Sequence, residues 1–327
     1  MRTLAHKTAL LGTAGVLALL AACSTGGEDT TEAAPQATAE EQTAEVPQGA
    51  ITEAEALEVI AAYSETNNAA HRGSDASLLE EIEGGSLLQR SLADLEQRLG
   101  RPEAEREPIE EWEYTDSEIY VPAGETWWMA QAVAGTDEDE RQLLTFEQST
   151  EDKKQWLLVS VVPLNADLPA IALDEDGLAE AAPADDPAGK MLPQDAVQAY
   201  EDLWETGGTG PGEQLATGPT GQDILERRTP EDPLMLSRIN ATTPDHEHTW
   251  ALRTEDGGTV VVATTAHSET LTAATGEALY PGELAAHYDP TPRNPVITHH
   301  TGEIVVSIPA AADPQILGDR WKLIGAE

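Results

Sequence analysis

Two short stretches decide how this chain folds, Lys154-Gln-Trp-Leu-Leu-Val159 and Asp319-Arg-Trp-Lys-Leu-Ile324. Each sets a tryptophan among aliphatic residues, a composition that favours a strand packed on a core. The two stretches lie late in the two halves of the chain. They predict that each half closes its sheet with a tryptophan-bearing strand.

The first half is predicted to contain helices followed by strands. Thr52-Glu-Ala-Glu55 is a capping box, in which the threonine hydroxyl and the second glutamate satisfy free amides at a helix start. A second helical stretch, 77–99, is broken at Gly84-Gly85. After Pro108 the apolar period changes to two, which predicts one or two strands within 112–121 and further strands at 127–134, 142–148 and 155–164.

The second half repeats this order, which suggests a duplication. A helix begins near Pro193 and ends at the glycine-rich stretch 207–212, and strands are predicted at 249–254, 259–266, 269–274, 303–308 and 320–324. The helices align at an offset of 140 residues, Trp128 and Trp250 at 122, and Trp156 and Trp321 at 165. A duplication therefore requires a shorter helical part and an insertion of about 40 residues before the last strand.

The first 23 residues carry a targeting signal. Arg2 and Lys7 precede the apolar stretch 8–20, and Leu20-Ala-Ala-Cys23 ends it, as in a bacterial lipoprotein signal peptide with its lipobox. This resemblance implies cleavage after Ala22 and a thioether-linked diacylglycerol on Cys23. The alternative, a cleaved soluble secretory peptide, leaves the chain's single cysteine without a role.

Charge and cysteine content exclude several classes of protein. Without residues 1–22 the chain has 16 basic and 60 acidic residues, a formal charge of −44. Such a surface repels nucleic acid and anionic lipid, so a nucleic-acid partner is excluded. A single cysteine also excludes an internal disulfide. The acidity agrees with solubility, a salty medium, or cationic partners, and composition does not separate these.

A helical part followed by a curved antiparallel sheet with a Trp-Lys-Leu-Ile type of closing strand resembles the NTF2-like superfamily of cone-shaped α+β domains. Two such units behind a lipobox look like the uncharacterised membrane lipoproteins of actinobacteria. The resemblance implies an α+β fold of two tandem domains, each with a cavity between its helices and its sheet. Members use that cavity for catalysis, ligand binding or assembly, so the fold leaves the function open.

Composition divides the chain into five segments. We expect a signal peptide (1–22), a disordered acidic tether (23–50), a first α+β domain (51–166), an acidic Ala/Pro linker (167–190) and a second α+β domain (191–327). Within the linker, 168–173 is apolar enough to lie on a domain surface, whereas the run 181–187 is not.

Three side chains are candidates for a catalytic base in the cavities that the resemblance implies: His71, Asp116 and His267. None belongs to a recognisable dyad. His71 ends the first helix, where a cation near the carboxyl terminus is the simpler interpretation. Strand alternation leaves an inward His267 open. The sequence contains no Gly-x-Ser-x-Gly elbow and no Ser-x-x-Lys pattern, so nucleophilic catalysis is not indicated.

Four histidines of the second half are candidate metal ligands. His246 and His248 would share a strand face, and His299 and His300 lie in the same half of the chain. Two such pairs could bind zinc or copper if they converge. However, His246 follows Thr-Pro-Asp in an expected loop, and His299-His300 lies in an expected Pro/Asn/Thr/Gly-rich turn. Exposed loop histidines are the alternative interpretation.

The seven tryptophans are expected to build the cores, because the chain has only one phenylalanine. In the adjacent pair Trp127-Trp128, the side chains should face opposite sides of a strand. One of them should then lie in a cavity or on an exposed patch. This makes Trp127 and Trp128 the candidate interaction site.

These observations favour a lipid-anchored binding or assembly module on the extracytoplasmic face of the cell membrane, without catalytic activity and without a cofactor. Its partners are expected to be the membrane, through the lipid on Cys23, and a protein or small molecule outside the cell. The alternative is a cavity enzyme, or a metal- or small-ligand-binding protein, that uses the second domain.

Overall fold

The computed structural model describes residues 48–135, 141–152, 154–187, 189–228 and 234–327. The signal peptide, and with it Ala22 and Cys23, lies outside the described residues, as does the tether up to residue 47. Among the described residues, no helix is long and apolar enough to cross a membrane.

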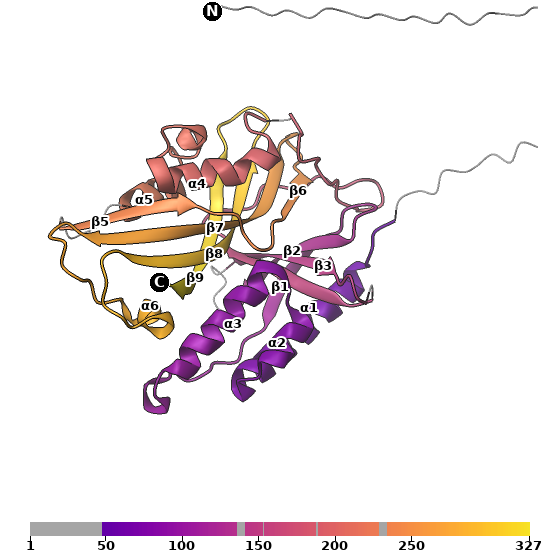
Figure 1. The fold of residues 1–327 in the computed structure, drawn as a ribbon. Helices are drawn as coiled ribbons and strands as arrows, with labels where there is room; N and C mark the ends of the chain where they lie inside the picture. Colours follow the sequence, from indigo (N-terminus) through magenta and orange to yellow (C-terminus); the bar gives the residue numbers. More distant parts are fainter. Residues whose placement is uncertain (1–47, 136–140, 153, 188, 229–233) are drawn as a thin grey trace, which may run out of the picture. The chain divides into compact units, whose positions relative to one another are not determined.

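Three helices and a four-stranded sheet come first in the chain (Figure 1). The helices are α1 (Glu53–Gly73), α2 (Ala76–Ile82) and α3 (Gly85–Gly100), and a 3-10 turn, Glu103–Glu105, follows. The strands β1 (Tyr114–Tyr120), β2 (Trp127–Ala134), β3 (Arg141–Gln148) and β4 (Trp156–Pro163) form an antiparallel meander in sequence order.

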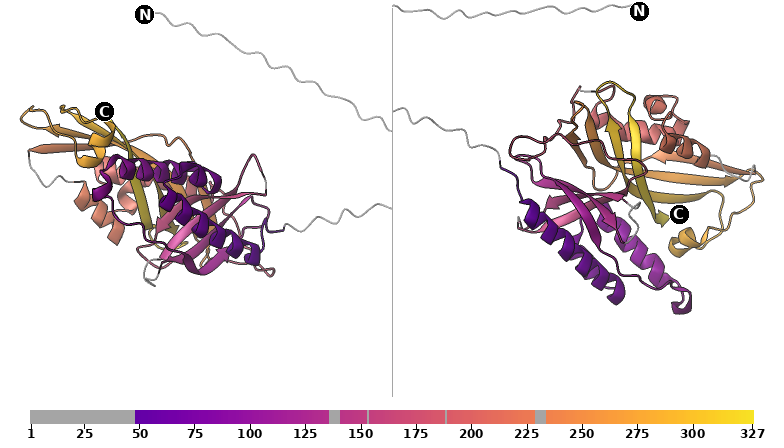
Figure 2. Two further views of the ribbon diagram at one scale, coloured as in Figure 1. Left: turned by 90° about the horizontal axis from the view of Figure 1, so that it is seen from below. Right: turned by 180° about the vertical axis from the view of Figure 1, so that it is seen from behind.

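A five-stranded antiparallel sheet follows, with the order β5-β7-β8-β9 and with β6 paired to β7. Its strands are β5 (Met235–Ala241), β6 (Thr249–Arg253), β7 (Thr259–Ala273), β8 (Val296–Ile308) and β9 (Gln315–Ala326). The helices are α4 (Ala196–Thr206), α5 (Pro219–Arg227) and α6 (Glu283–Tyr288), with 3-10 turns at Pro193–Asp195 and Pro211–Gln214. Figures 1 and 2 show α1 and α3 beside the first sheet, and α4 and α5 beside the second.

The predicted α+β class is confirmed at this level: two antiparallel sheets with a few helices. The capping box is confirmed too, since the Glu55 amide donates to Thr52 Oγ1 at 3.3 Å and the Thr52 amide donates to Glu55 Oε2 at 3.0 Å. The break at Gly84-Gly85 separates α2 from α3, and the Gly84 amide bonds the carbonyl of Leu158 at 3.0 Å. This hydrogen bond attaches the junction between α2 and α3 to β4.

Three local expectations are wrong. The stretches 259–266 and 269–274, predicted as two strands, form the single strand β7, which pairs with β8 without interruption. His299 and His300 lie within β8 instead of a turn, because β7 and β9 pair with both sides of that segment. The run 181–187 is docked, although it has few apolar side chains. The Ala182 amide donates to the carbonyl of Ala251 at 2.9 Å, and the buried Asp186 forms an ion pair with Arg253. Backbone pairing, which residue type does not reveal, holds this run in place.

Four hydrophobic cores lie among the described residues, the smallest of them around Leu79 where α1, α2 and α3 meet. One lies between α1 and the first sheet around Trp128 and Phe146, whose rings stack at 4.2 Å, and one lies between α4 and the second sheet around Tyr200. A further core combines Trp127 from the first sheet with Trp250 and valines from the second. The described residues between 48 and 327 therefore form one compact unit.

Candidate functional site

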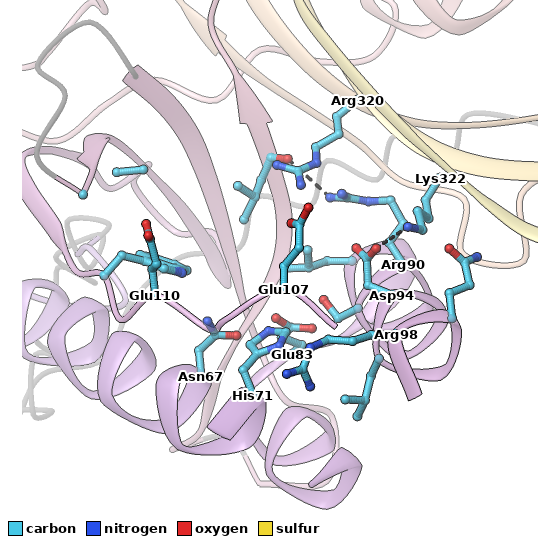
Figure 3. Close-up of a pocket in the computed structure, with 18 of the residues that line it drawn as sticks. Asn67, His71, Glu83, Arg90, Asp94, Arg98, Glu107, Glu110, Arg320 and Lys322 are labelled. Carbon is cyan, nitrogen blue, oxygen red and sulfur yellow. Dashed lines mark hydrogen bonds and ion pairs between the residues drawn. The ribbon is translucent and has the colours of Figure 1, made fainter. Parts of the chain in front are cut away.

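A cavity with a volume of about 760 Å³ lies among the described residues. Its walls come from α1, α3, the segment 101–114, the first sheet and β9 (Figure 3). This volume is typical of a small-molecule site. We name it the arginine cavity after the cations that line it: Arg90, Arg98, Arg101, Arg106, Arg320 and Lys322.

α3 supplies the first group of these cations. Arg90, Asp94 and Arg98 are spaced four residues apart and therefore lie on one face of the helix. Arg320 and Lys322 alternate along β9, so they share a face of that strand. Lys322 Nζ pairs with the Asp94 carboxylate, which links the helix face to the strand face. Figure 3 shows these side chains converging from the two elements.

Arg90 is buried beneath the cavity surface. Its Nη2 lies 2.6 Å from Oε2 of Glu303, and the two side chains are only 4% and 0% exposed. Arg90 Nη2 also donates to the carbonyl of Val161 at 3.3 Å, and Ser86 Oγ donates to Glu303. The pair thus joins α3 to both sheets, and the other polar contacts offset part of its desolvation cost.

Arg320 differs from Arg90 in lacking a carboxylate partner. Among the described residues its side chain has no ion pair or hydrogen bond, although Glu303 lies opposite it in the β8–β9 register. The residue as a whole stays exposed. Partial burial of the guanidinium in the cavity wall and the charge of Arg90 lower the pKa of Arg320. An anion beside it would therefore be stabilised.

Glu83 forms the inner wall of the cavity at the junction of α2 and α3. It is 2% exposed, and the Tyr63 hydroxyl donates to its Oε1 at 2.7 Å. Its Oε2 has no hydrogen-bond partner among the described residues. Burial raises the pKa of Glu83 to about 7 and also raises the pKa of Tyr63. A protonated Glu83 can donate a hydrogen bond inside the cavity.

An aromatic wall is supplied by Trp112, just before β1, and Tyr114, the first residue of β1. The rings of Trp112 and Tyr114 meet edge to face at 4.8 Å. Asn68 holds the backbone at Trp112, since its Nδ2 donates to the Trp112 carbonyl at 2.7 Å and its Oδ1 accepts from the Trp112 amide at 3.3 Å. A second cavity of about 570 Å³ shares Trp112 and Tyr114 with the first.

The predicted interaction pair is buried. Trp127 and Trp128 are 9% and 0% exposed and point to opposite sides of β2, as expected. Trp127 lies in the core that the two sheets share, and Trp128 lies in the core under α1. Binding of a partner through either side chain stays a prediction.

The four candidate metal ligands lie in different environments. His246 is exposed, and His248 stacks on Trp250 with ring centroids 5.1 Å apart. His299 faces the carboxylate of Glu327 at 3.4 Å, while the buried His300 lies on the other face of β8. Within the described part of the chain, no group of three or more His, Cys, Asp or Glu is placed to hold a metal.

The three candidate bases have different positions. His71 lines the arginine cavity, and burial lowers its pKa. Asp116 lies at an irregularity of β1 with a positive φ of 47° and is exposed outside both cavities. His267 points inward, with Trp204 at 6.0 Å and His300 at 4.9 Å between ring centroids. Burial lowers the pKa of His267 to about 4 and of His300 to about 3.

The cations of the cavity were not predicted as a site. Their signal is the four-residue spacing of Arg90, Asp94 and Arg98 in a chain with only 18 basic residues. The contribution of β9 was not detectable, because Arg320 lies 230 positions from Arg90 in sequence.

Comparison with known proteins finds a family model and relatives that match most of this chain. The model of a family described as a domain of unknown function, DUF8094, matches residues 47–327. An uncharacterised lipoprotein of Streptomyces coelicolor is 29% identical over 325 residues, 94% of this chain and 90% of its own length. A second from that organism is 28% identical over 79% of this chain and 76% of its own length.

A third relative, an uncharacterised lipoprotein of Streptomyces avermitilis, is 27% identical over 69% of each chain. No solved structure matches the chain significantly.

Proposed function

The chain belongs to the DUF8094 family, and on that premise we propose that it is a lipid-anchored binding protein on the extracytoplasmic face of the cell membrane. The lipobox before Cys23 supports the anchor, and so do the printed names of the relatives, which call them lipoproteins. The lipid would hold the acidic body near the membrane through the tether 23–50.

One observation carries the binding role: the arginine cavity of about 760 Å³. It combines unpaired charge, a carboxyl that is partly neutral near pH 7 and an aromatic wall. A few polar groups converging in a cavity of this size are characteristic of small-ligand sites. The ligand would therefore be a small molecule, and binding would not require catalysis.

We also propose that the body consists of two NTF2-like domains, 51–166 and 191–327, joined by the segment 167–190. The repeated order of helices followed by an antiparallel sheet supports this division. The arginine cavity would then lie between the helices and sheet of the first domain, with Arg320 and Lys322 added by the second.

A second function is supported by Glu83 alone. A carboxyl in a cavity with a pKa of about 7 is suited to general acid–base catalysis. In that case the cavity would belong to an enzyme, with Glu83 as the proton-transferring group and Tyr63 as its hydrogen-bond partner. Glu83→Gln would abolish turnover of a bound substrate without abolishing its binding.

The anchor is tested by labelling cells with an alkyne analogue of palmitate. Wild-type protein should carry the label and sediment with membranes, whereas Cys23→Ser should do neither. Ser24→Ala is the control, since it changes the neighbouring residue and keeps the cysteine. Unlabelled wild-type protein in the medium would contradict the anchor.

The binding role is tested by thermal unfolding of the mature chain, carrying Cys23→Ser to keep it soluble, in the presence of fractionated small molecules from the growth medium. A ligand of the arginine cavity should raise the unfolding temperature of the mature chain and have less effect on Trp112→Ala. The proposal fails if no fraction stabilises the protein.

A further inference from the structure

We infer that the arginine cavity binds a small organic anion, a carboxylate or a phosphate monoester on an apolar body, with Arg320 as its main charged contact. This inference rests on the proposed function, because it identifies the ligand class of the same cavity.

The first support is the concentration of positive charge. The chain has 18 Lys and Arg residues against 60 Asp and Glu. Six of the 18 line this cavity, but only five of the 60 do so: Glu83, Asp94, Glu107, Glu110 and Glu111. On an otherwise acidic protein, an anion would find its most favourable potential here.

The second support is that some of these cations have no carboxylate partner in the part of the chain that the structure describes. Arg90, Arg101 and Lys322 are paired with Glu303, Glu283 and Asp94, respectively. Arg106 donates to the backbone carbonyls of Arg101 and Leu99.

Within the described residues, the Arg98 side chain has one hydrogen bond, to the Ser74 hydroxyl at 3.5 Å, and the Arg320 side chain has no ion pair or hydrogen bond. A guanidinium binds carboxylate or phosphate through two parallel hydrogen bonds, so Arg320 offers an unused two-donor face.

The third support is the chemistry of the other residues that line the cavity. Trp112, Tyr114 and Leu95 give the cavity an apolar wall, which an inorganic ion would not use. Glu83 has a buried oxygen without a partner and a pKa raised to about 7 by burial, so its protonated form can donate to an anion instead of repelling it.

The exposed Glu107 and Glu110 line the same cavity. Their charges would repel a large polyanion at the entrance, which favours a small ligand with one anionic group.

The test is isothermal titration of the mature chain carrying Cys23→Ser with phenyl phosphate and benzoate, and with the uncharged benzyl alcohol and the cationic benzylamine. Phenyl phosphate should bind at one saturable site, and added NaCl should weaken it. Arg320→Gln should weaken binding about ten- to a hundredfold, as expected for loss of a charge-assisted contact. Arg98→Gln is the second variant if Arg320→Gln does not fold.

Arg238→Gln is the matched control. Arg238 is exposed on β5, in the same sheet as Arg320, and lies outside the cavity. The same loss of charge at this position should therefore leave binding within about twofold of the wild type. Equal effects of the two substitutions would overturn the inference, since they would show non-specific attraction.

The two levels of the proposal fail differently. If benzyl alcohol or benzylamine binds as tightly as phenyl phosphate and Trp112→Ala removes that binding, the cavity is a binding site but the anion class is wrong. If none of the four probes binds but a fraction of the growth medium still raises the unfolding temperature, the anion class is wrong and the binding role stands; if neither a probe nor a fraction has an effect, both proposals are overturned.

The same phosphate chemistry could belong to a lipid headgroup. Cosedimentation with phosphatidylglycerol vesicles that depends on Arg320 and is displaced by phenyl phosphate would identify that source. Saturable binding of phenyl phosphate without vesicle binding would identify a free small molecule.

Discussion

Arg90 of α3 and Glu303 of β8 form a buried ion pair, with 2.6 Å between Nη2 and Oε2. The pair links α3, which packs beside the first sheet, to the second sheet. Arg90 also lines the arginine cavity, and Glu303 lies behind it. A cavity built from residues of both halves of the chain keeps its shape only if such contacts hold the halves together.

Replacing Glu303 with Gln should destabilise the protein strongly. The Arg90 guanidinium would stay buried without an opposing charge, which costs about 3–5 kcal/mol of unfolding free energy in comparable cases. Urea denaturation followed by far-UV circular dichroism measures the change. Asp313→Asn, which breaks the exposed pair with Lys190, should cost less than about 1 kcal/mol. Equal losses for the two variants would show that the buried pair contributes no more than a surface pair.

Glu83 should make the stability of the protein fall as pH rises. Its folded-state pKa of about 7 lies above the ordinary value of 4.5, so the folded chain keeps a proton that the unfolded chain releases. Between pH 4.5 and 7 the free energy of unfolding should therefore decrease, by up to about 3 kcal/mol from this group.

Glu83→Gln removes this contribution and keeps an acceptor for the Tyr63 hydroxyl. Denaturation at pH 5 and pH 8 should show that the variant gains stability relative to wild type at the higher pH. The exposed Glu80→Gln serves as the control and should follow the wild type. A parallel pH profile for Glu83→Gln and wild type would contradict a raised pKa.

The stacked pair His267 and His300 should make the stability of the protein fall as the pH falls, the opposite of the effect of Glu83. Burial lowers the pKa values of these histidines to about 4 and about 3, so the unfolded chain binds protons first as pH falls below 6.5. Stability should decrease from pH 6.5 downward by up to about 1.4 kcal/mol per pH unit for each histidine. His300→Gln should show a shallower decrease between pH 6.5 and 5 than the exposed-site control His246→Gln. Identical slopes would refute the assignment.

Local patterns predicted much of the fold. The capping box at Thr52, the break at Gly84-Gly85 and the strands around Trp128 and Trp156 depend on neighbours within a few residues, and the structure has them. His299-His300 was misassigned because its strand character comes from pairing with β7 and β9, far away in sequence. Residue type alone carries no trace of such pairing.

The candidate site was predictable only in part. The sequence shows His71 at the end of a helix, and the structure brings it to the cavity wall. Arg320 could not be joined to Arg98 from sequence, because their proximity depends on how β9 packs against α3. In the sequence, Glu83 does not differ from the surface glutamates. Its carboxyl lies beside Tyr63 because of the turn between α2 and α3.

The most direct measurement is a crystal structure of the mature chain, carrying Cys23→Ser, with phenyl phosphate. We predict that the phosphate lies within hydrogen-bond distance of the Arg320 guanidinium and that the phenyl ring lies against Trp112. Phosphate bound only at other surface arginines, with the arginine cavity occupied by water alone, would contradict the account.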